Sequence, residues 1–305
     1  MPSTAQNRLR LFAQHLRHLQ RPLVQEADLA VCFLQTLAEA GDLPEKPAAA
    51  ELRRDFRRFR DSLLDFGGLE LFTERKKLHG YLVGITAVPK AEEAICSLDP
   101  FVYISHLSAM AWHGLTDRLP KTLFLTSPSV KLWRILSHKR LENQLKALYP
   151  VYQRAKLPLY RRTNLQRLQN RPLNIWSSSR LDEAYQAAFK RAEGGLLRLS
   201  TLGRCFLDMV REPELCGGIH HVVEVFENEG PVHADAIITE LNQHGNKLER
   251  ARAGYLLESA NPELAKHPTL EQWASEVTRG GSRKLDPSAD YADTFSERWA
   301  LSINV

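Results

Sequence analysis

The sequence predicts a helix-rich α+β protein with two domains. Apolar residues recur at helical spacing in the first 65 residues and again after residue 181. Short apolar runs bordered by Gly or Pro lie between these regions and are typical of β-strands. The length of 305 residues is sufficient for two hydrophobic cores. We place the domain boundary between residues 95 and 96, so the predicted domains are 1–95 and 96–305.

The composition excludes several classes of protein. Hydrophobic residues make up 43% of the chain and charged residues 25%, as in an ordinary globular protein and unlike a disordered or collagen-like one. No apolar run approaches the roughly 18 residues of a membrane span, and no secretory signal is recognisable in residues 1–22. The four cysteines are sparse and irregularly spaced. We therefore expect a cytoplasmic protein without disulfides and without a membrane partner.

Residues 5–83 predict three helices followed by a β-hairpin. Apolar stripes at spacings of three and four residues place the helices over about residues 5–20, 26–41 and 47–67. Two short extended runs follow, at 69–73 and 78–83, and they flank the polar tip 74–77. Two such runs around a short polar tip are typical of a hairpin.

Three helices followed by a hairpin is the element order of a winged helix-turn-helix. In such a module the last helix enters the major groove of DNA and the hairpin lies along the backbone. Arginine suits both tasks because its planar fork pairs with guanine edges or with phosphates. The expected DNA contacts are Arg53, Arg54, Arg57, Arg58 and Arg60 on the third helix, and Arg75, Lys76 and Lys77 on the hairpin. The alternative is that these arginines are solvated or paired with the acidic residues of the same helix, Asp55, Asp61 and Asp65.

Residues 121–180 hold nearly all of the excess positive charge. This block has 13 Lys and Arg but one acidic residue, whereas 181–305 has 13 basic and 20 acidic residues. Aromatic residues are interleaved with the cations, as on nucleic-acid-binding surfaces. The block residues expected to contact a nucleic-acid backbone are Lys131, Arg134, Lys139, Arg140, Arg161 and Arg162. Alternatively, the basic block folds against the acidic end of the chain.

The second domain is predicted to mix strands and helices, with acidic helices over residues 181–305. Pro89–Cys96 is interpreted as the linker into this domain. Strands are predicted at 101–104, 121–126 and 299–305. Helices are predicted over 106–113, 201–210, from 217 to about 226, 233–243 and 248–258.

No motif in the sequence indicates catalysis. G-x-S-x-G, Walker, H-E-x-x-H and C-x-x-C patterns are absent. A zinc site of Cys205, Cys216, His220 and His221 would crowd four ligands into one helix-turn-helix, so a packing role is favoured. We predict no catalytic residue, metal or cofactor. A nuclease using the basic block as its substrate groove is the enzymatic alternative, although the block itself offers only Glu142.

Several stretches of residues 101–305 resemble one family. They are Tyr103–Met110 with His113–Asp117, Leu199–Asp208 with its L-S-T-x-x-R pattern, Pro213–Gly218, Arg252–Glu258 with its R-x-G-Y-L-L-E pattern, and Trp299–Val305. These stretches are similar to the antitoxin of the AbiE abortive-infection type, AbiEi, a transcriptional regulator of type IV toxin–antitoxin operons. The first 95 residues match only in architecture, and the predicted first helix is an addition to the usual winged helix of the family.

The resemblance implies a function in phage defence. It implies that the N-terminal winged helix represses its own operon by binding inverted repeats in the promoter. It also implies an antitoxin domain that counters a nucleotidyltransferase toxin, with or without direct contact, and that carries a second positive surface for nucleic acid. The alternatives are an antitoxin that acts mainly by binding protein or RNA, and the nuclease.

Overall fold

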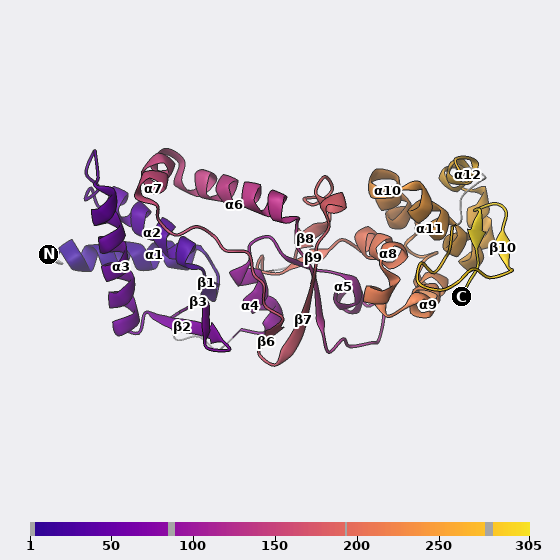
Figure 1. The fold of residues 1–305 in the computed structure, drawn as a ribbon, viewed down its shortest axis with the longest axis horizontal. Coiled ribbons are helices and arrows are strands. Elements are labelled where there is room, and N and C mark those ends of the chain that lie inside the picture. The colour runs from indigo at the N-terminus through magenta and orange to yellow at the C-terminus, as the bar shows by residue number, and fades with distance from the viewer. Residues whose placement is uncertain (1–3, 85–88, 193, 278–282) are drawn as a thin grey trace.

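The chain forms a mixed α/β fold that is rich in helix, as predicted. A computed structural model describes residues 4–84, 89–192, 194–277 and 283–305. The N-terminal helices lie at one end of an elongated molecule, a β-sheet lies in the middle, and the C-terminal helices lie at the other end (Figure 1). None of the helices in the described ranges is long and apolar enough to cross a bilayer.

The N-terminal part contains the three predicted helices and the hairpin. Its elements are α1 (Thr4–His18), β1 (Leu23–Val24), α2 (Glu26–Glu39), α3 (Ala49–Asp65), β2 (Leu69–Glu74) and β3 (Lys77–Val83). The strands form an antiparallel sheet in the order β1-β3-β2. Glu74 pairs with Lys77, so Arg75 and Lys76 alone make the turn, both with positive φ. This confirms the hairpin, and β1 is an additional strand that the sequence did not predict.

The linker predicted over Pro89–Cys96 is wrong, because most of it lies in helix α4 (Ala91–Leu98). The backbone N–H of Lys90 donates to Glu93 at 3.1 Å and caps this helix. Its apolar residues recur at helical spacing, and they pack in one core with Leu23 and Leu82 of the N-terminal sheet. The boundary predicted between residues 95 and 96 therefore falls inside a buried helix.

The middle of the molecule is a six-stranded mixed sheet with helices around it. Its elements are β4 (Tyr103–Ile104), α5 (His106–Trp112), β5 (Leu123–Thr126), α6 (Val130–Leu145), α7 (Tyr149–Ala155), β6 (Arg167–Leu168), β7 (Arg171–Trp176), β8 (Phe189–Arg191) and β9 (Arg198–Ser200). The strand order is β6-β7-β5-β4-β9-β8. β5 pairs in parallel with β7, and β4 with β9, while the other neighbours are antiparallel.

The helices of the basic block fold onto the N-terminal helices. Trp133, Leu141 and Tyr152 from α6 and α7 share a core with Phe12 and Phe56 from α1 and α3. Among the described residues, the one ion pair of the block joins Arg171 to Glu92, outside the acidic end. In the described part of the chain, the cations of the block are therefore not paired with the acidic residues of 181–305, although Ser129 bonds to Asp182 and strands of the block share the central sheet with β8 and β9. The apolar residues of α6 and α7 determine where the block packs, and most cations of α6 are left on the surface.

The C-terminal part is helical, as predicted. Its elements are α8 (Leu202–Arg211), α9 (Ile219–Glu229), α10 (Ala234–His244), α11 (Lys247–Ala260), α12 (Pro268–Ser275), β10 (Phe295–Ser296) and β11 (Leu301–Ser302). Thr201 caps α8 by accepting from the backbone N–H of Arg204, and Asn246 caps α11 in the same way. The strand predicted over 299–305 is confirmed only for the two residues of β11.

His106 is a buried histidine at the start of α5. It is 1% exposed, and its Nδ1 lies 2.8 Å from Ser105 Oγ. Its Nε2 is buried without a hydrogen-bond partner among the described residues. Burial, together with a smaller contribution from the charge of Arg211, lowers the pKa of His106 to about 3. The folded protein therefore holds this side chain neutral throughout the physiological range.

Acidification is expected to lower the free energy of unfolding, because the pKa of His106 is depressed in the folded protein. An unfolded histidine titrates near pH 6.5, so below that pH the unfolded chain binds a proton that folded His106 does not. From pH 7 to pH 5 the wild type should lose about 2 kcal/mol relative to His106→Asn, which tolerates the same positive φ of 48°. Urea unfolding of both proteins at the two pH values measures this difference. If the stability difference between the wild type and His106→Asn were the same at both pH values, folded His106 would bind its proton as readily as the unfolded chain does.

Candidate nucleic-acid interface

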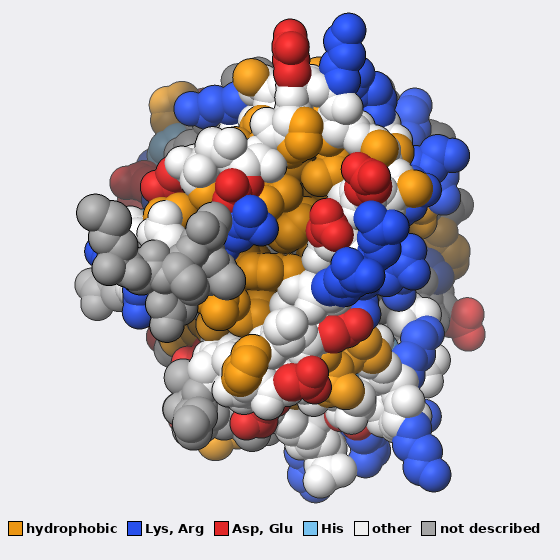
Figure 2. Space-filling model, turned by 90° about the vertical axis from the view of Figure 1, so that its left-hand side faces the viewer, with side chains coloured by type: hydrophobic (Ala, Val, Ile, Leu, Met, Phe, Trp, Pro, Cys, Tyr) orange, Lys and Arg blue, Asp and Glu red, His pale blue; other side chains and the backbone are white. Residues whose placement is uncertain are grey.

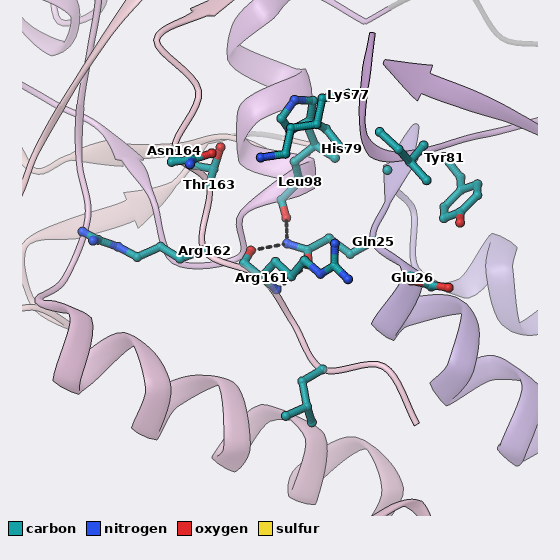
Figure 3. Close-up of a pocket in the computed structure, with 13 residues that line it drawn as sticks. Gln25, Glu26, Lys77, His79, Tyr81, Leu98, Arg161, Arg162, Thr163 and Asn164 are labelled. Atoms are coloured by element: carbon teal, nitrogen blue, oxygen red, sulfur yellow. Dashed lines mark hydrogen bonds between the residues drawn. The ribbon is translucent and has the colours of Figure 1, made fainter. Parts of the chain in front are cut away.

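A basic groove lies between β3 and the segment of residues 159–164. Its volume is about 230 Å³. Lys77 and His79 line it from β3, and Arg161 and Arg162 line it from the segment (Figure 3). The structure thus brings together cations from the hairpin and from the basic block, two sets that the sequence predicted separately.

Gln25, a residue that lines the groove, links the segment 159–164 to the end of α4. Its Nε2 donates to the carbonyls of Leu98 at 2.5 Å and of Arg161 at 2.8 Å, and its Oε1 accepts from the backbone N–H of Arg161 at 2.7 Å. Figure 3 shows the two donated bonds as dashed lines from Gln25 to Leu98 and Arg161. The side chain is buried, so water competes little for these bonds. Gln25 thus helps to hold Arg161 in place, together with the bonds of its neighbours Tyr160 to Asp28 and Thr163 to Asp99.

The charge of the groove is positive. Glu26 is the only carboxylate among its described lining residues, and it is already paired with Arg60 of α3 at 2.6 Å. Burial lowers the pKa of His79, and the nearby Lys77 lowers it further. His79 is therefore largely neutral at neutral pH. The groove offers Lys77 and Arg161 as cations, which suit an anionic ligand.

The hairpin residues lie where the sequence placed them. Arg75 and Lys76 form the exposed turn, and Lys77 begins β3 at the edge of the groove. In the segment, Arg161 is exposed, whereas Arg162 donates to Ser127 Oγ at 3.3 Å and to the carbonyl of Pro128 at 3.2 Å. Arg161 is therefore freer than Arg162 to contact a ligand.

The five arginines of α3 divide into two groups. Arg53 donates to the carbonyl of Ala155 on α7 at 2.8 Å, and Arg60 pairs with Glu26 and Asp61. The remaining three are exposed: Arg54, Arg57 and Arg58. The alternative of pairing within the helix thus holds for Arg60 with Asp61 and, at 4.0 Å, for Arg54 with Asp55. We expect the three exposed arginines to be the ones available for DNA.

The surface around α3 carries both signs of charge. Figure 2 looks onto this end of the molecule and shows Lys and Arg side chains gathered along one side, with Asp and Glu among them, around a hollow of hydrophobic side chains. On α3 itself, the three exposed arginines accompany four exposed carboxylates, those of Glu51, Asp55, Asp61 and Asp65. The helix alone is therefore not a strongly positive surface.

The predicted contacts on α6 lie apart from the groove. Lys131, Arg134 and Lys139 are exposed on the outer face of this helix. Figure 1 shows α6 along one edge of the molecule and the hairpin along the opposite edge. Arg140 faces inward instead and lies over the ring of Tyr160, 5.3 Å from its centroid. Arg140 is thus not part of the outer surface on which the sequence placed it.

Gln25 and His79 are the two residues of this site that the sequence did not indicate. A single glutamine between a two-residue strand and a helix has no distinctive spacing. His79 was counted only as part of an extended run. Their roles depend on the segment 159–164, more than 70 residues away in the chain.

Comparisons with known proteins leave the family open. No protein-family model matches the chain, and no curated protein matches it. Among solved structures it is similar to the Rv2827c protein from Mycobacterium tuberculosis, with a TM-score of 0.48 and 13% sequence identity, over 99% of this chain and 91% of that chain. A likeness at this level carries no inference about function.

Proposed function

We propose that this chain is a DNA-binding transcriptional regulator that contacts its operator through the hairpin, the basic groove and α3. The observation that carries the proposal is the convergence of Lys77 with Arg161 beside the exposed cations Arg75 and Lys76. Cations that line a groove next to a protruding turn suit the phosphate backbone of a nucleic acid.

The order of the N-terminal elements supports duplex DNA as the ligand. The order helix, strand, helix, helix and hairpin, with a three-stranded antiparallel sheet, supports a winged helix. In that arrangement α3 would enter the major groove, where Arg54, Arg57 and Arg58 could reach guanine edges. The hairpin and the groove would then follow the adjacent backbone.

We further propose an antitoxin role, which rests on the resemblance of residues 101–305 to AbiEi. In this role the chain represses its own promoter at inverted repeats and counters a nucleotidyltransferase toxin of a phage-defence operon. Co-expression with the nucleotidyltransferase encoded beside it tests this part. Restored growth would support it, and a stable complex on co-purification would indicate that protein binding is the mechanism.

A salt-titrated mobility shift tests DNA binding. The duplex upstream of the gene is compared with a scrambled duplex of equal length. We expect selective binding to the upstream duplex and a steep fall in affinity as the salt concentration rises. The reason is that each contact to a phosphate releases condensed counterions from the DNA. Equal and weak binding to both duplexes would contradict the proposal.

The double variant Lys76→Ala, Lys77→Ala is expected to weaken binding about tenfold on both duplexes. It should also make the slope of log K against log salt shallower by about two, since each lysine contacts one phosphate. Lys247→Ala, Lys266→Ala is the matched control, because these two lysines lie in the C-terminal helical part. If the hairpin variant and this control had the same slope, the hairpin would not contact DNA.

A further inference from the structure

A second cavity is lined by four arginines. It lies between the end of α1, helix α6 and the connection from β8 to β9, and its volume is about 100 Å³. Arg21, Arg140, Arg191 and Arg198 line it. None of its described lining residues is acidic, and it shares no lining residue with the basic groove.

The guanidinium groups are held in place before any ligand arrives. Arg198 is buried and donates to the carbonyls of Val102 at 2.7 Å, Cys96 at 2.9 Å and Asp99 at 2.6 Å. Arg191 donates to the carbonyl of Gly195 at 3.0 Å. Arg140 is held over the ring of Tyr160. The positive charges therefore cannot move apart freely to lower their repulsion.

Two donors in this cluster lack an acceptor. Nη1 of Arg21 and Nε of Arg140 are buried atoms without an acceptor in the described part of the chain, although the guanidinium of Arg140 also interacts with the side chain of Tyr160. The closest carboxylate oxygen is Oδ1 of Asp28, 3.6 Å from Nη1 of Arg21, and this oxygen already accepts from the hydroxyl of Tyr160 at 2.7 Å. Buried donors without acceptors are unfavourable, so an anion that supplied acceptors would stabilise the cluster.

We propose that this cavity binds a single phosphate group. The volume suits one tetrahedral oxyanion and not a whole nucleotide, whose remainder would have to lie outside. Guanidinium forks pair with phosphate oxygens through charge-assisted hydrogen bonds, which are stronger than neutral ones. Arg191 and Gly194 are exposed, so the cavity can be reached from solvent on that side.

A bound phosphate would connect three distant parts of the chain. Arg21 follows α1, Arg140 belongs to α6, and Arg191 and Arg198 belong to β8 and β9. Binding would therefore stabilise the N-terminal helices against the central sheet. The full-length protein should unfold at a higher temperature when phosphate is present.

Thermal unfolding of the full-length protein in inorganic phosphate tests the site. Ionic strength is held constant with sodium chloride, and phosphate is varied up to about 10 mM. We expect a saturable rise of several degrees in the unfolding midpoint. Arg191→Gln should weaken the apparent phosphate affinity at least tenfold, and Arg191→Lys should fall between this variant and the wild type because it keeps the charge without the fork.

Arg10→Gln is the matched control, since Arg10 is an exposed arginine on α1 that does not line the cavity. Phosphate also stabilises proteins generally by exclusion from their surface, and that effect is shared by every variant. Equal midpoint shifts for the wild type and Arg191→Gln would overturn the proposal.

A second titration with adenosine monophosphate in place of inorganic phosphate identifies which kind of phosphate the cavity takes. A saturable shift of the unfolding midpoint would show that the cavity also takes phosphate monoesters, and no shift would show that it takes only the free anion. Failure of DNA binding would leave this test unaffected.

Discussion

Arg204→Met is expected to lower the free energy of unfolding by about 3–5 kcal/mol, the range measured when one partner of a buried ion pair is removed. Arg204 is fully buried in α8, and its Nη2 lies 2.7 Å from Oε1 of Glu240 on α10. Asp208, one turn further along α8, is also buried. Without Arg204, the charges of Glu240 and Asp208 lose their main counterion in a region with little water.

The pH dependence of this loss gives the prediction a second readout. Burial raises the pKa of Asp208 to about 6, although Arg204 and Arg211 lower it. In Arg204→Met this pKa should rise further. Near pH 6 the buried Asp208 is then protonated and neutral, whereas at pH 8 folding must keep its carboxylate charged without Arg204 or leave it protonated against the solution pH, and both cost stability. The difference in stability between the wild type and the variant should therefore grow as pH rises from 6 to 8.

Urea unfolding followed by circular dichroism measures both effects. The double variant Arg204→Met, Glu240→Leu is the informative control, because removing both charges should recover part of the stability. A single-variant loss below about 1 kcal/mol, independent of pH, would show that Arg204 does not act as the counterion of this cluster.

Gly254→Ala is expected to lower the free energy of unfolding by about 2 kcal/mol, although alanine forms helices better than glycine by about 1 kcal/mol. Gly254 lies in the middle of α11, and a Cβ there would be 2.2 Å from Cη2 of Trp299. The indole of Trp299 is buried, and its N–H donates to Glu258 at 2.5 Å, so the ring has little room to move away. The clash should therefore outweigh the gain in helix propensity.

The partner of the clash can be removed to check the cause. In a Trp299→Leu background, Gly254→Ala should be neutral or stabilising, because the ring that meets the Cβ is gone. Ala253→Gly serves as the matched helix control and should be destabilising in both backgrounds. If Gly254→Ala were stabilising in the wild type, the C-terminal segment would not pack against α11 as described.

The sequence by itself predicted most of the local structure. The apolar stripes of α1, α2 and α3 are properties of neighbouring residues, so they can be read without the rest of the fold. The hairpin was predictable for the same reason, because its turn residues stand between two short extended runs. The two-residue strand β1 was not, since so short a segment has no periodicity.

Helix α4 shows the limit of this approach. Its helical spacing was present in the sequence, but a proline and a position between two predicted domains favoured a linker. The structure buries the helix between the N-terminal sheet and the core of the middle part. Burial against residues distant in the chain is not visible in a local pattern.

The sequence also determined how much positive charge the chain has and in which block it lies, but the tertiary structure decided what each cation does. Arg140 and Arg161 belong to the same basic block, yet one lies inside a cluster of arginines and the other beside the hairpin. Arg53 and Arg54 are neighbours on α3, yet Arg53 bonds to α7 and Arg54 is exposed. The physical reason is that a long side chain can reach several partners, and which partners are within reach depends on how distant segments pack.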